Sequence, residues 1–80
     1  MDIALIGKMV RYHRKVSGLS RVEFAMFAGL GKTVIYDIEH GKTTVKLATL
    51  QKVLAVLNIK MEFTSPLMED FKASLLNNKS

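Results

Sequence analysis

The sequence predicts an all-α fold, a bundle of four to five short helices with one short strand near the C-terminus. Apolar residues recur at helical spacing in successive stretches of the chain, which favours helices. Two of these stretches flank a glycine-containing turn in the middle of the chain, which is typical of two helices joined tightly. Over residues 59–64 the apolar period changes to two, the period of a strand. Eighty residues allow one domain with a small core.

The composition favours a basic module without cysteine chemistry. The absence of cysteine excludes disulfides and cysteine-type zinc sites, and no ligand spacing links His13 to His40, so we expect no metal. With no signal peptide and no apolar run of about 18 residues, we expect a cytoplasmic protein. The net charge is +5, and residues 1–63 carry ten basic against five acidic residues. This excess suits a polyanion such as nucleic acid.

The first helix is predicted from about Ile3 to Ser17, with Gly18 ending it. Its inner face repeats at i, i+3, i+4 and i+7 and comprises Ile6, Met9, Val10 and His13.

Residues 20–41 hold two short helical patterns joined by a turn. Ser20 and Glu23 have the spacing of a capping box, which predicts the start of the second helix. Gly29 suits the C-cap, where a positive φ is favoured. The next pattern buries Ile35 and Ile38 and turns polar residues outward. A helix, a glycine turn and a second helix with a polar outer face form the helix-turn-helix motif.

These residues resemble the helix-turn-helix of phage-repressor-like regulators, the Xre family. The residues at its spacings are Ala25, Gly29, Ile35 and Ile38. Arg14 and Glu39 match an arginine–glutamate pair that ties the first and third helices together in such repressors. The resemblance covers residues 5–63 and implies a lambda-repressor-like bundle that binds DNA. Residues 41–63 look most like the HipB-type antitoxin branch, in which a short strand follows the fourth helix.

By this resemblance, the third helix enters the major groove of DNA. The residues expected to contact DNA are Arg21, Lys32, Thr33, Val34, Tyr36, Asp37, Lys42 and Thr43. Arg21 and Lys32 can donate to guanine or phosphate, and Asp37 can accept from the cytosine amino group. Two features depart from the family pattern: Gly31 leaves the third helix without a side-chain cap, and Asp37 places a negative charge on the DNA-facing surface.

The fourth helix is predicted to start between Thr44 and Ala48 and to end at Asn58, closing the core against the first and third helices. Its apolar stripe comprises Leu47, Leu50, Val53, Leu54 and Leu57. A strand over residues 59–64 would follow, and a lone strand requires a partner, so we expect it to pair with a second copy. The dimerisation residues would be Ile59, Lys60, Met61, Glu62 and Phe63. Such a homodimer would place two recognition helices roughly 34 Å apart, for a palindromic operator.

The C-terminal residues predict a short amphipathic helix and a frayed tail. Ser65 and Pro66 suit the first positions of a helix that runs to about Leu76. Its apolar face comprises Leu67, Met68, Phe71 and Leu75. The segment is uncharged overall, so membrane binding is not expected. An apolar patch on the outer face of the second helix comprises Val22, Met26 and Phe27. Either another part of this chain covers this patch or, together with Phe71, it binds a partner.

The sequence therefore divides into a helix-turn-helix DNA-binding domain (1–58), a dimerisation strand (59–64), and a C-terminal amphipathic helix with its tail (65–80). We expect a sequence-specific transcriptional repressor, the autoregulatory antitoxin of a HipA-like kinase toxin. A free-standing phage-like repressor without a toxin, and a protein-interaction module that has lost DNA binding, are the alternatives. No catalytic constellation or cofactor-binding motif is present, so we expect no enzyme activity.

Overall fold

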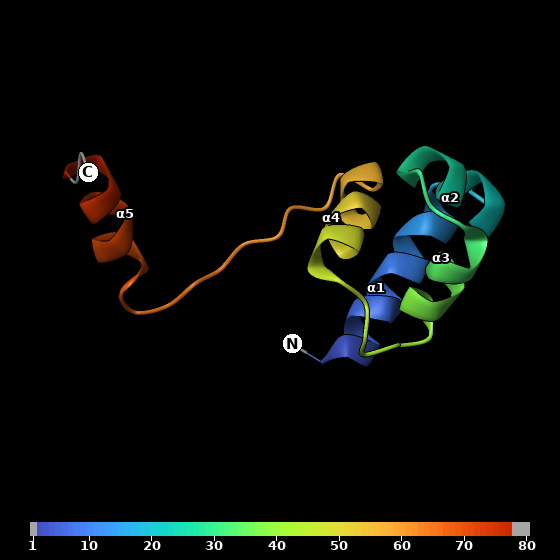
Figure 1. The fold of residues 1–80 in the computed structure, drawn as a ribbon, viewed down its shortest axis with the longest axis horizontal. Coiled ribbons are helices and arrows are strands. Elements are labelled where there is room, and N and C mark those ends of the chain that lie inside the picture. Colours follow the sequence, from blue (N-terminus) through green and yellow to red (C-terminus); the bar gives the residue numbers. More distant parts are fainter. Residues whose placement is uncertain (1, 78–80) are drawn as a thin grey trace.

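The computed structural model describes residues 2–77 and contains four packed helices and a fifth that stands apart (Figure 1). The helices are α1 (Ile3–Val16), α2 (Arg21–Ala28), α3 (Lys32–Glu39), α4 (Leu47–Val56) and α5 (Met68–Asn77). The first four form a bundle, and α5 lies at the end of an extended connection (Figure 1). The predicted all-α class and helix-turn-helix bundle are therefore confirmed.

The core is small and draws on each of the four packed helices. Its buried apolar residues are Val10, Phe24, Ala25, Ile35, Ile38, Val53 and Leu54. The inner faces predicted from helical spacing in α1, α3 and α4 supply most of them. His13 is half-buried at the edge, where its Nδ1 lies 2.7 Å from the carbonyl oxygen of Met9. This is the packed role that the sequence indicated.

Gly7 allows α1 to approach α3 closely. It is buried, and a Cβ built on it would lie 2.9 Å from the Glu39 carbonyl oxygen and still closer to that of Ile38. Any side chain here would push the start of α1 away from the end of α3. The close crossing of these two helices therefore depends on a glycine.

The fourth helix begins at Leu47, inside the predicted range, and ends at Val56, two residues before the predicted end at Asn58. Asn58, with a positive φ of 57°, then turns the chain. Its closest packing is against α2. The prediction that it closes the core against the first and third helices did not include α2; Val53 and Leu54 do share one core cluster with Val10 of α1 and with Ile35 and Ile38 of α3. Leu47 stays 56% exposed, and a groove remains between α4 and α1.

The predicted strand over residues 59–64 does not form within residues 2–77. Instead these residues make an extended connection, with Ile59 and Met61 packed against the core and Phe63 exposed. The Ile59 N–H donates to the Leu54 carbonyl at 3.0 Å, so the start of the connection completes the end of α4. The alternating pattern thus reflects one side of an extended segment resting on the bundle, which requires no β pairing.

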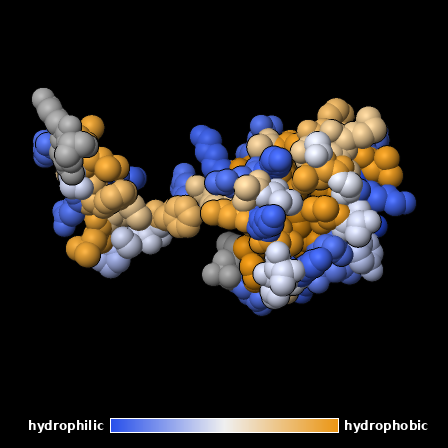
Figure 2. All heavy atoms as spheres, in the orientation of Figure 1, coloured by the Kyte–Doolittle hydropathy of each residue, from blue (hydrophilic) through white to orange (hydrophobic). Residues whose placement is uncertain are grey.

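The fifth helix occupies the predicted C-terminal segment and begins two residues after Pro66. It buries none of its residues, and its large apolar side chains remain exposed; they are Phe71, Leu75 and Leu76, preceded by Leu67. Figure 2 shows apolar surface along α5 as well as on the bundle. No helix within residues 2–77 is long and apolar enough to cross a membrane. Most of the predicted frayed tail lies outside the described residues.

Candidate nucleic-acid interface

The start of α2 is fixed by the predicted capping box. The Ser20 Oγ accepts from the Glu23 N–H at 3.1 Å, and the Glu23 Oε1 accepts from the Ser20 N–H at 2.9 Å. The hydrogen bond that the Ser20 backbone N–H donates to the Glu23 carboxylate is the largest cause that lowers the pKa of Glu23 from its ordinary value, and the Ser20 side chain lowers this pKa further. The sequence pattern was therefore sufficient to locate this helix.

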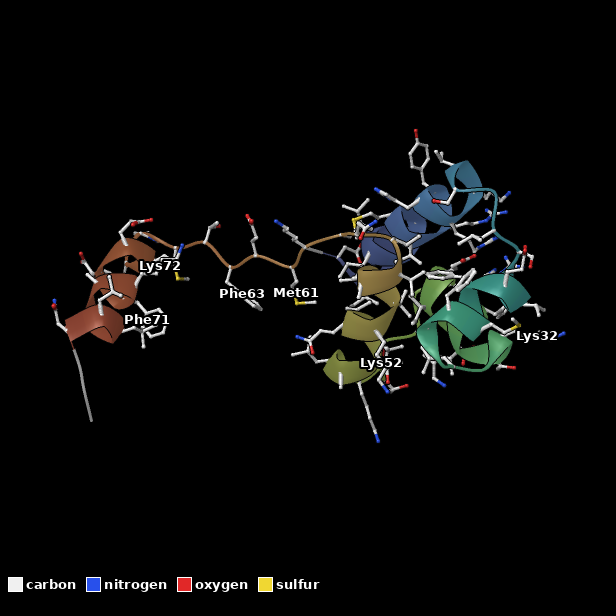
Figure 3. All side chains as sticks on the ribbon, turned by 90° about the horizontal axis from the view of Figure 1, so that it is seen from above. Lys32, Lys52, Met61, Phe63, Phe71 and Lys72 are labelled. Carbon is white, nitrogen blue, oxygen red and sulfur yellow. The ribbon has the colours of Figure 1, made fainter. Side chains whose placement is uncertain are left out.

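The turn between α2 and α3 has the geometry that its glycines predict. Gly29 adopts the left-handed conformation with φ of 70°, and the Leu30 N–H donates to the Ala25 carbonyl at 2.9 Å. Gly31 then caps α3 with extended backbone and no side-chain hydrogen bond, as expected. Lys32 follows at the first position of α3, and its side chain points away from the bundle (Figure 3).

Behind this turn, Glu39 holds two arginines. It is buried, and its carboxylate accepts from Arg14 Nε at 2.6 Å and Nη2 at 3.1 Å. Arg14 Nη1 also donates to the Leu19 carbonyl at 2.9 Å. The structural pairing of Arg14 with Glu39, tying α1 to the end of α3, is confirmed.

Arg21 has a second role that the sequence reading missed. Its Nε donates to Glu39 Oε1 at 3.2 Å, and its guanidinium carbon lies 5.4 Å from the centroid of the Tyr36 ring. Its side chain is still one-third exposed. Arg21 is therefore anchored by a buried carboxylate and an aromatic ring, which orients the cation beside the outer face of α3.

Tyr36 is held by its neighbours as well. Its ring stacks on His40 with centroids 3.8 Å apart, and the His40 Nδ1 lies 2.7 Å from the Tyr36 carbonyl oxygen. The Tyr36 side chain remains about half exposed. An aromatic ring fixed on both sides presents its hydroxyl at low entropic cost, which suits a contact residue.

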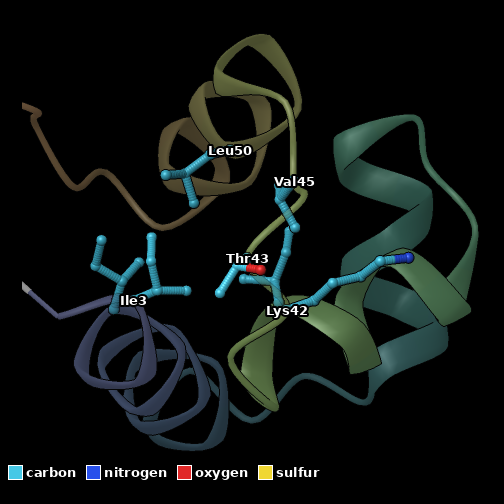
Figure 4. Close-up of a pocket in the computed structure, with 7 residues that line it drawn as sticks. Ile3, Lys42, Thr43, Val45 and Leu50 are labelled. Atoms are coloured by element: carbon cyan, nitrogen blue, oxygen red, sulfur yellow. The ribbon is translucent and has the colours of Figure 1, made fainter.

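The negative charge of Asp37 is countered within the site. Lys42 Nζ lies 3.3 Å from Asp37 Oδ2, and both side chains are partly exposed. The Lys42 side chain extends from the loop along α3 (Figure 4). Sequence reasoning named both residues as independent DNA contacts. It did not predict their pairing, because the sequence does not reveal the path of the loop that carries Lys42 past the end of α3.

Two surface hollows flank α3 and gather most of the predicted contact residues. The first lies toward α2 and is lined by Arg14, Ser20, Arg21, Val22, Lys32, Thr33 and Tyr36. The second lies toward α4 and is lined by Val34, Asp37, Lys42, Thr44, Val45, Lys46 and Thr49. The outer face of α3 therefore runs between two hollows, each of which contains cations.

The loop residues differ from the prediction at one position. Thr43 lines an apolar pocket with Ile3, Val45 and Leu50, where α1 begins (Figure 4). Thr44 and Lys46, which sequence reasoning overlooked, line the hollow beside α3 instead. The only available signal was the run of lysine and threonine after Gly41, and this run does not reveal which members face α3.

The apolar patch predicted on α2 is present. Val22, Met26 and Phe27 are 53%, 72% and 66% exposed, so no part of residues 2–77 covers them. Phe71, which the sequence grouped with them, lies on the separate helix α5. The four residues named for partner binding therefore belong to two surfaces.

Comparison with known families and proteins agrees with this geometry. A family model described as helix-turn-helix matches residues 10–63. The uncharacterized HTH-type transcriptional regulator y4mF of Sinorhizobium fredii is 36% identical over 61 residues, covering 76% of this chain and 80% of the relative. The uncharacterized HTH-type transcriptional regulator YazB of Bacillus subtilis is 29% identical over 66 residues, covering 82% and 96%.

Two solved structures have the same fold. The restriction-modification controller protein C.AhdI from Aeromonas hydrophila aligns with a TM-score of 0.66 and 28% identity, covering 72% of this chain and 88% of that one. A chain of the complex between the SinR and SinI proteins aligns with a TM-score of 0.60 and 26% identity, covering 89% and 78%.

Proposed function

We propose, because this chain belongs to the helix-turn-helix family of transcriptional regulators, that it is a sequence-specific DNA-binding repressor acting on its own operon. The observation that supports this best is the outer face of α3, which lies exposed between two hollows that contain cations. A helix with this exposure fits the major groove, and cations on either side of it can contact the two flanking backbones.

Each residue has a role that suits its position. Lys32 and Thr33, in the first turn of α3, are proposed to reach base edges, while Tyr36 adds a hydroxyl one turn later. Arg21 on one side, and Lys42 with Lys46 on the other, would contact phosphates. The free N–H groups at the start of α4, where Lys46 provides no side-chain cap, are further phosphate donors. The protein would act as a homodimer on a palindromic operator.

The test is a titration of the full-length protein with the DNA upstream of its own gene, at several salt concentrations and against random competitor DNA. We expect saturable binding, steeply weakened by salt and well above binding to the competitor. The double variant Lys32→Ala with Thr33→Ala should lose the preference for this DNA. Lys52→Ala is the control for charge, because Lys52 lies on α4 (Figure 3) and lines neither of the two hollows that flank α3.

Two outcomes would contradict the proposal. Equal weak binding to every DNA, unchanged by the double variant, would leave only a general charge effect and favour a protein-interaction module. A loss of operator preference in Lys52→Ala as large as in the double variant would show that total charge, and not the face of α3, carries the binding.

An antitoxin role is the finer proposal, supported by the HipB-like pattern of residues 41–63 and by the exposed patch of Val22, Met26 and Phe27. Exposed apolar patches of this kind tend to mark interaction surfaces. Its test requires a HipA-like kinase gene next to this one: the purified kinase should bind the repressor, and Met26→Lys with Phe27→Ser should abolish that binding while DNA binding persists. Binding unaffected by this variant would exclude the patch. If the repressor does not bind the kinase, it is a free-standing regulator.

A further inference from the structure

An apolar groove runs between α1 and α4, away from the hollows that flank α3. We call it the α1–α4 groove; it is lined by Ile6, Met9, Leu47, Leu50, Leu54, Ile59, Lys60, Met61, Glu62 and Phe63. Leu47 and Phe63 are 56% and 70% exposed on its walls. Groups of large exposed apolar side chains in a groove indicate a surface that binds another apolar element.

The chain also carries an apolar helix face that packs against no other part of residues 2–77. Leu67, Phe71 and Leu75 follow one another at helical spacing on and just before α5, and each is more than half exposed. A helix of ten residues is marginal in water without packing of its apolar face. The same chain thus presents an open apolar groove and an unpacked amphipathic helix.

The path of the connection favours a groove on a second copy over the groove of the same chain. Lys60 to Phe63 line the groove themselves and then lead away from it, and Phe71 lies at the far end (Figure 3). To return, the chain would have to reverse within residues 64–67, where Pro66 restricts Ser65 to extended conformations. Extended, the connection of about ten residues spans roughly 33 Å, enough to reach a neighbouring bundle.

Charge complementarity supports the same occupant. The first turn of α5 carries Glu69 and Asp70, and neither takes part in an ion pair within residues 2–77. The bundle is basic, and α1 carries a shallow hollow lined by Lys8, Arg11 and Lys15, with Tyr12. The attraction between an acidic helix and a basic bundle favours docking of α5 on a bundle.

We infer that α5 of each protomer docks its apolar face into the α1–α4 groove of a second copy, in a reciprocal two-fold exchange. The two contacts are identical and close the assembly at a dimer, as an isologous interface requires. This inference deepens the homodimer of the proposed function and rests on it. It differs from the predicted pairing of strands 59–64 because α5 makes the contact between the two copies. The extended connection only links α5 to its own bundle.

The decisive test uses single cysteines, since the chain has none of its own. Full-length Leu47→Cys, in the groove, and full-length Leu75→Cys, on α5, are mixed, allowed to exchange subunits and treated with a short bis-maleimide. We expect a covalent heterodimer of the two variants by mass spectrometry, with neither variant cross-linking alone. Sedimentation should show a dimer, and Phe71→Glu should raise its dissociation constant at least tenfold. Leu76→Glu is the control: it changes an 84% exposed position on another side of α5 and should leave the dimer intact.

Other outcomes overturn the inference. Cross-linking of Leu75→Cys alone would mean that the two α5 helices pair with each other. A cross-link within one chain of the double variant Leu47→Cys, Leu75→Cys would place α5 in its own groove. Absence of a heterodimer in the mixture excludes the exchange. None of these readouts involves DNA, so operator binding with a failed cross-link removes only this interface, and a cross-link without operator binding removes only the repressor function.

Discussion

At the scale of single residues, Glu39 is a buried carboxylate whose charge must be balanced inside the protein. Its buried carboxylate is balanced by Arg14 and Arg21, so three helices meet around one negative charge. Removing one member of a buried pair leaves the remaining charge unpaired, which costs more than the pair itself contributes. We therefore assign this cluster to stability first and to DNA binding only through the exposed part of Arg21.

Arg14→Ala should lower the free energy of unfolding by about 3–5 kcal/mol, because Glu39 would keep only the partly exposed Arg21. Urea denaturation followed by circular dichroism measures this. Arg11→Ala, on an exposed position of the same helix, is the matched control and should change stability by less than about 0.5 kcal/mol. If both variants change the free energy of unfolding by the same small amount, the ion pair of Arg14 and Glu39 does not stabilise the fold.

Glu23 provides a pH-dependent contribution of defined sign. Its pKa lies below the ordinary value of 4.5 because Ser20 donates to the ionised carboxylate. A lowered pKa in the folded state gives stability above the unfolded pKa that is lost as the pH falls through the folded pKa. The melting temperature of the protein should therefore exceed that of Glu23→Ala near pH 6, and the difference should shrink below pH 4.5. A difference that stays constant across this range would contradict the assignment.

Side-chain pairings show where sequence reasoning was sufficient and where it was not. The capping box of Ser20 and Glu23 was predictable because both partners lie within one helical turn. The pair of Arg14 and Glu39 was expected only through the family resemblance, since 25 residues separate them. Arg21 was assigned to DNA alone because its contact with Glu39 depends on how α2 crosses α3, which periodicity does not reveal.

At the scale of elements, Gly7 sets how closely α1 can cross α3. Gly7→Ala should destabilise the protein by about 1–3 kcal/mol or more, because the new methyl group meets backbone carbonyls that belong to a helix end and cannot rotate away. Gly31→Ser is the contrasting change: it meets open space and adds a side-chain cap to α3, so stability should rise by a few tenths of a kcal/mol. Thermal unfolding of the two variants separates these expectations. If Gly7→Ala leaves the thermal stability unchanged, α1 and α3 can move apart at this crossing without destabilising the protein.

The four packed helices and α5 were predictable from apolar periodicity and from the glycines and caps at their ends. The strand was not, because alternation describes an extended segment, whereas a strand also needs a paired neighbour. Ile59 and Met61 alternate because one side of the connection rests on the core. Periodicity likewise could not show that α4 would pack closely against α2, since an apolar stripe does not identify the helix that it contacts.

At the scale of the whole molecule, the two bundles of the proposed homodimer should bind two half-sites together. Joining two binding modules raises affinity by about 10²–10⁴-fold without any new contact, provided that the spacing allows both to engage. On a palindromic operator with half-sites one helical turn apart, inserting about five base pairs between them turns the second half-site to the opposite side of the duplex. We expect this insertion to weaken binding by about 10²-fold or more in a gel-shift titration.

Two controls accompany this titration. Inserting a full helical turn of DNA keeps both half-sites on the same side of the duplex, and the variant Phe71→Glu removes the dimer contact. The variant should bind intact and altered operators with the same reduced affinity, because a single bundle does not sense spacing. If the wild-type protein is also insensitive to the insertion, it binds as independent monomers.

In the proposed complex with DNA, the contact between Lys42 and Asp37 would affect how mismatched sequences are rejected. In the free protein the lysine neutralises the carboxylate at 3.3 Å, and a phosphate that attracts Lys42 competes with Asp37 for it. Once the lysine leaves, the carboxylate faces the duplex without a counterion and repels it unless a base offers an N–H in its place. A cytosine amino group does so; guanine and thymine present only acceptors at the corresponding edge. On the proposed mode of DNA binding, discrimination at the base pair that faces Asp37 would arise from the penalty on mismatched sequences more than from attraction to the correct one.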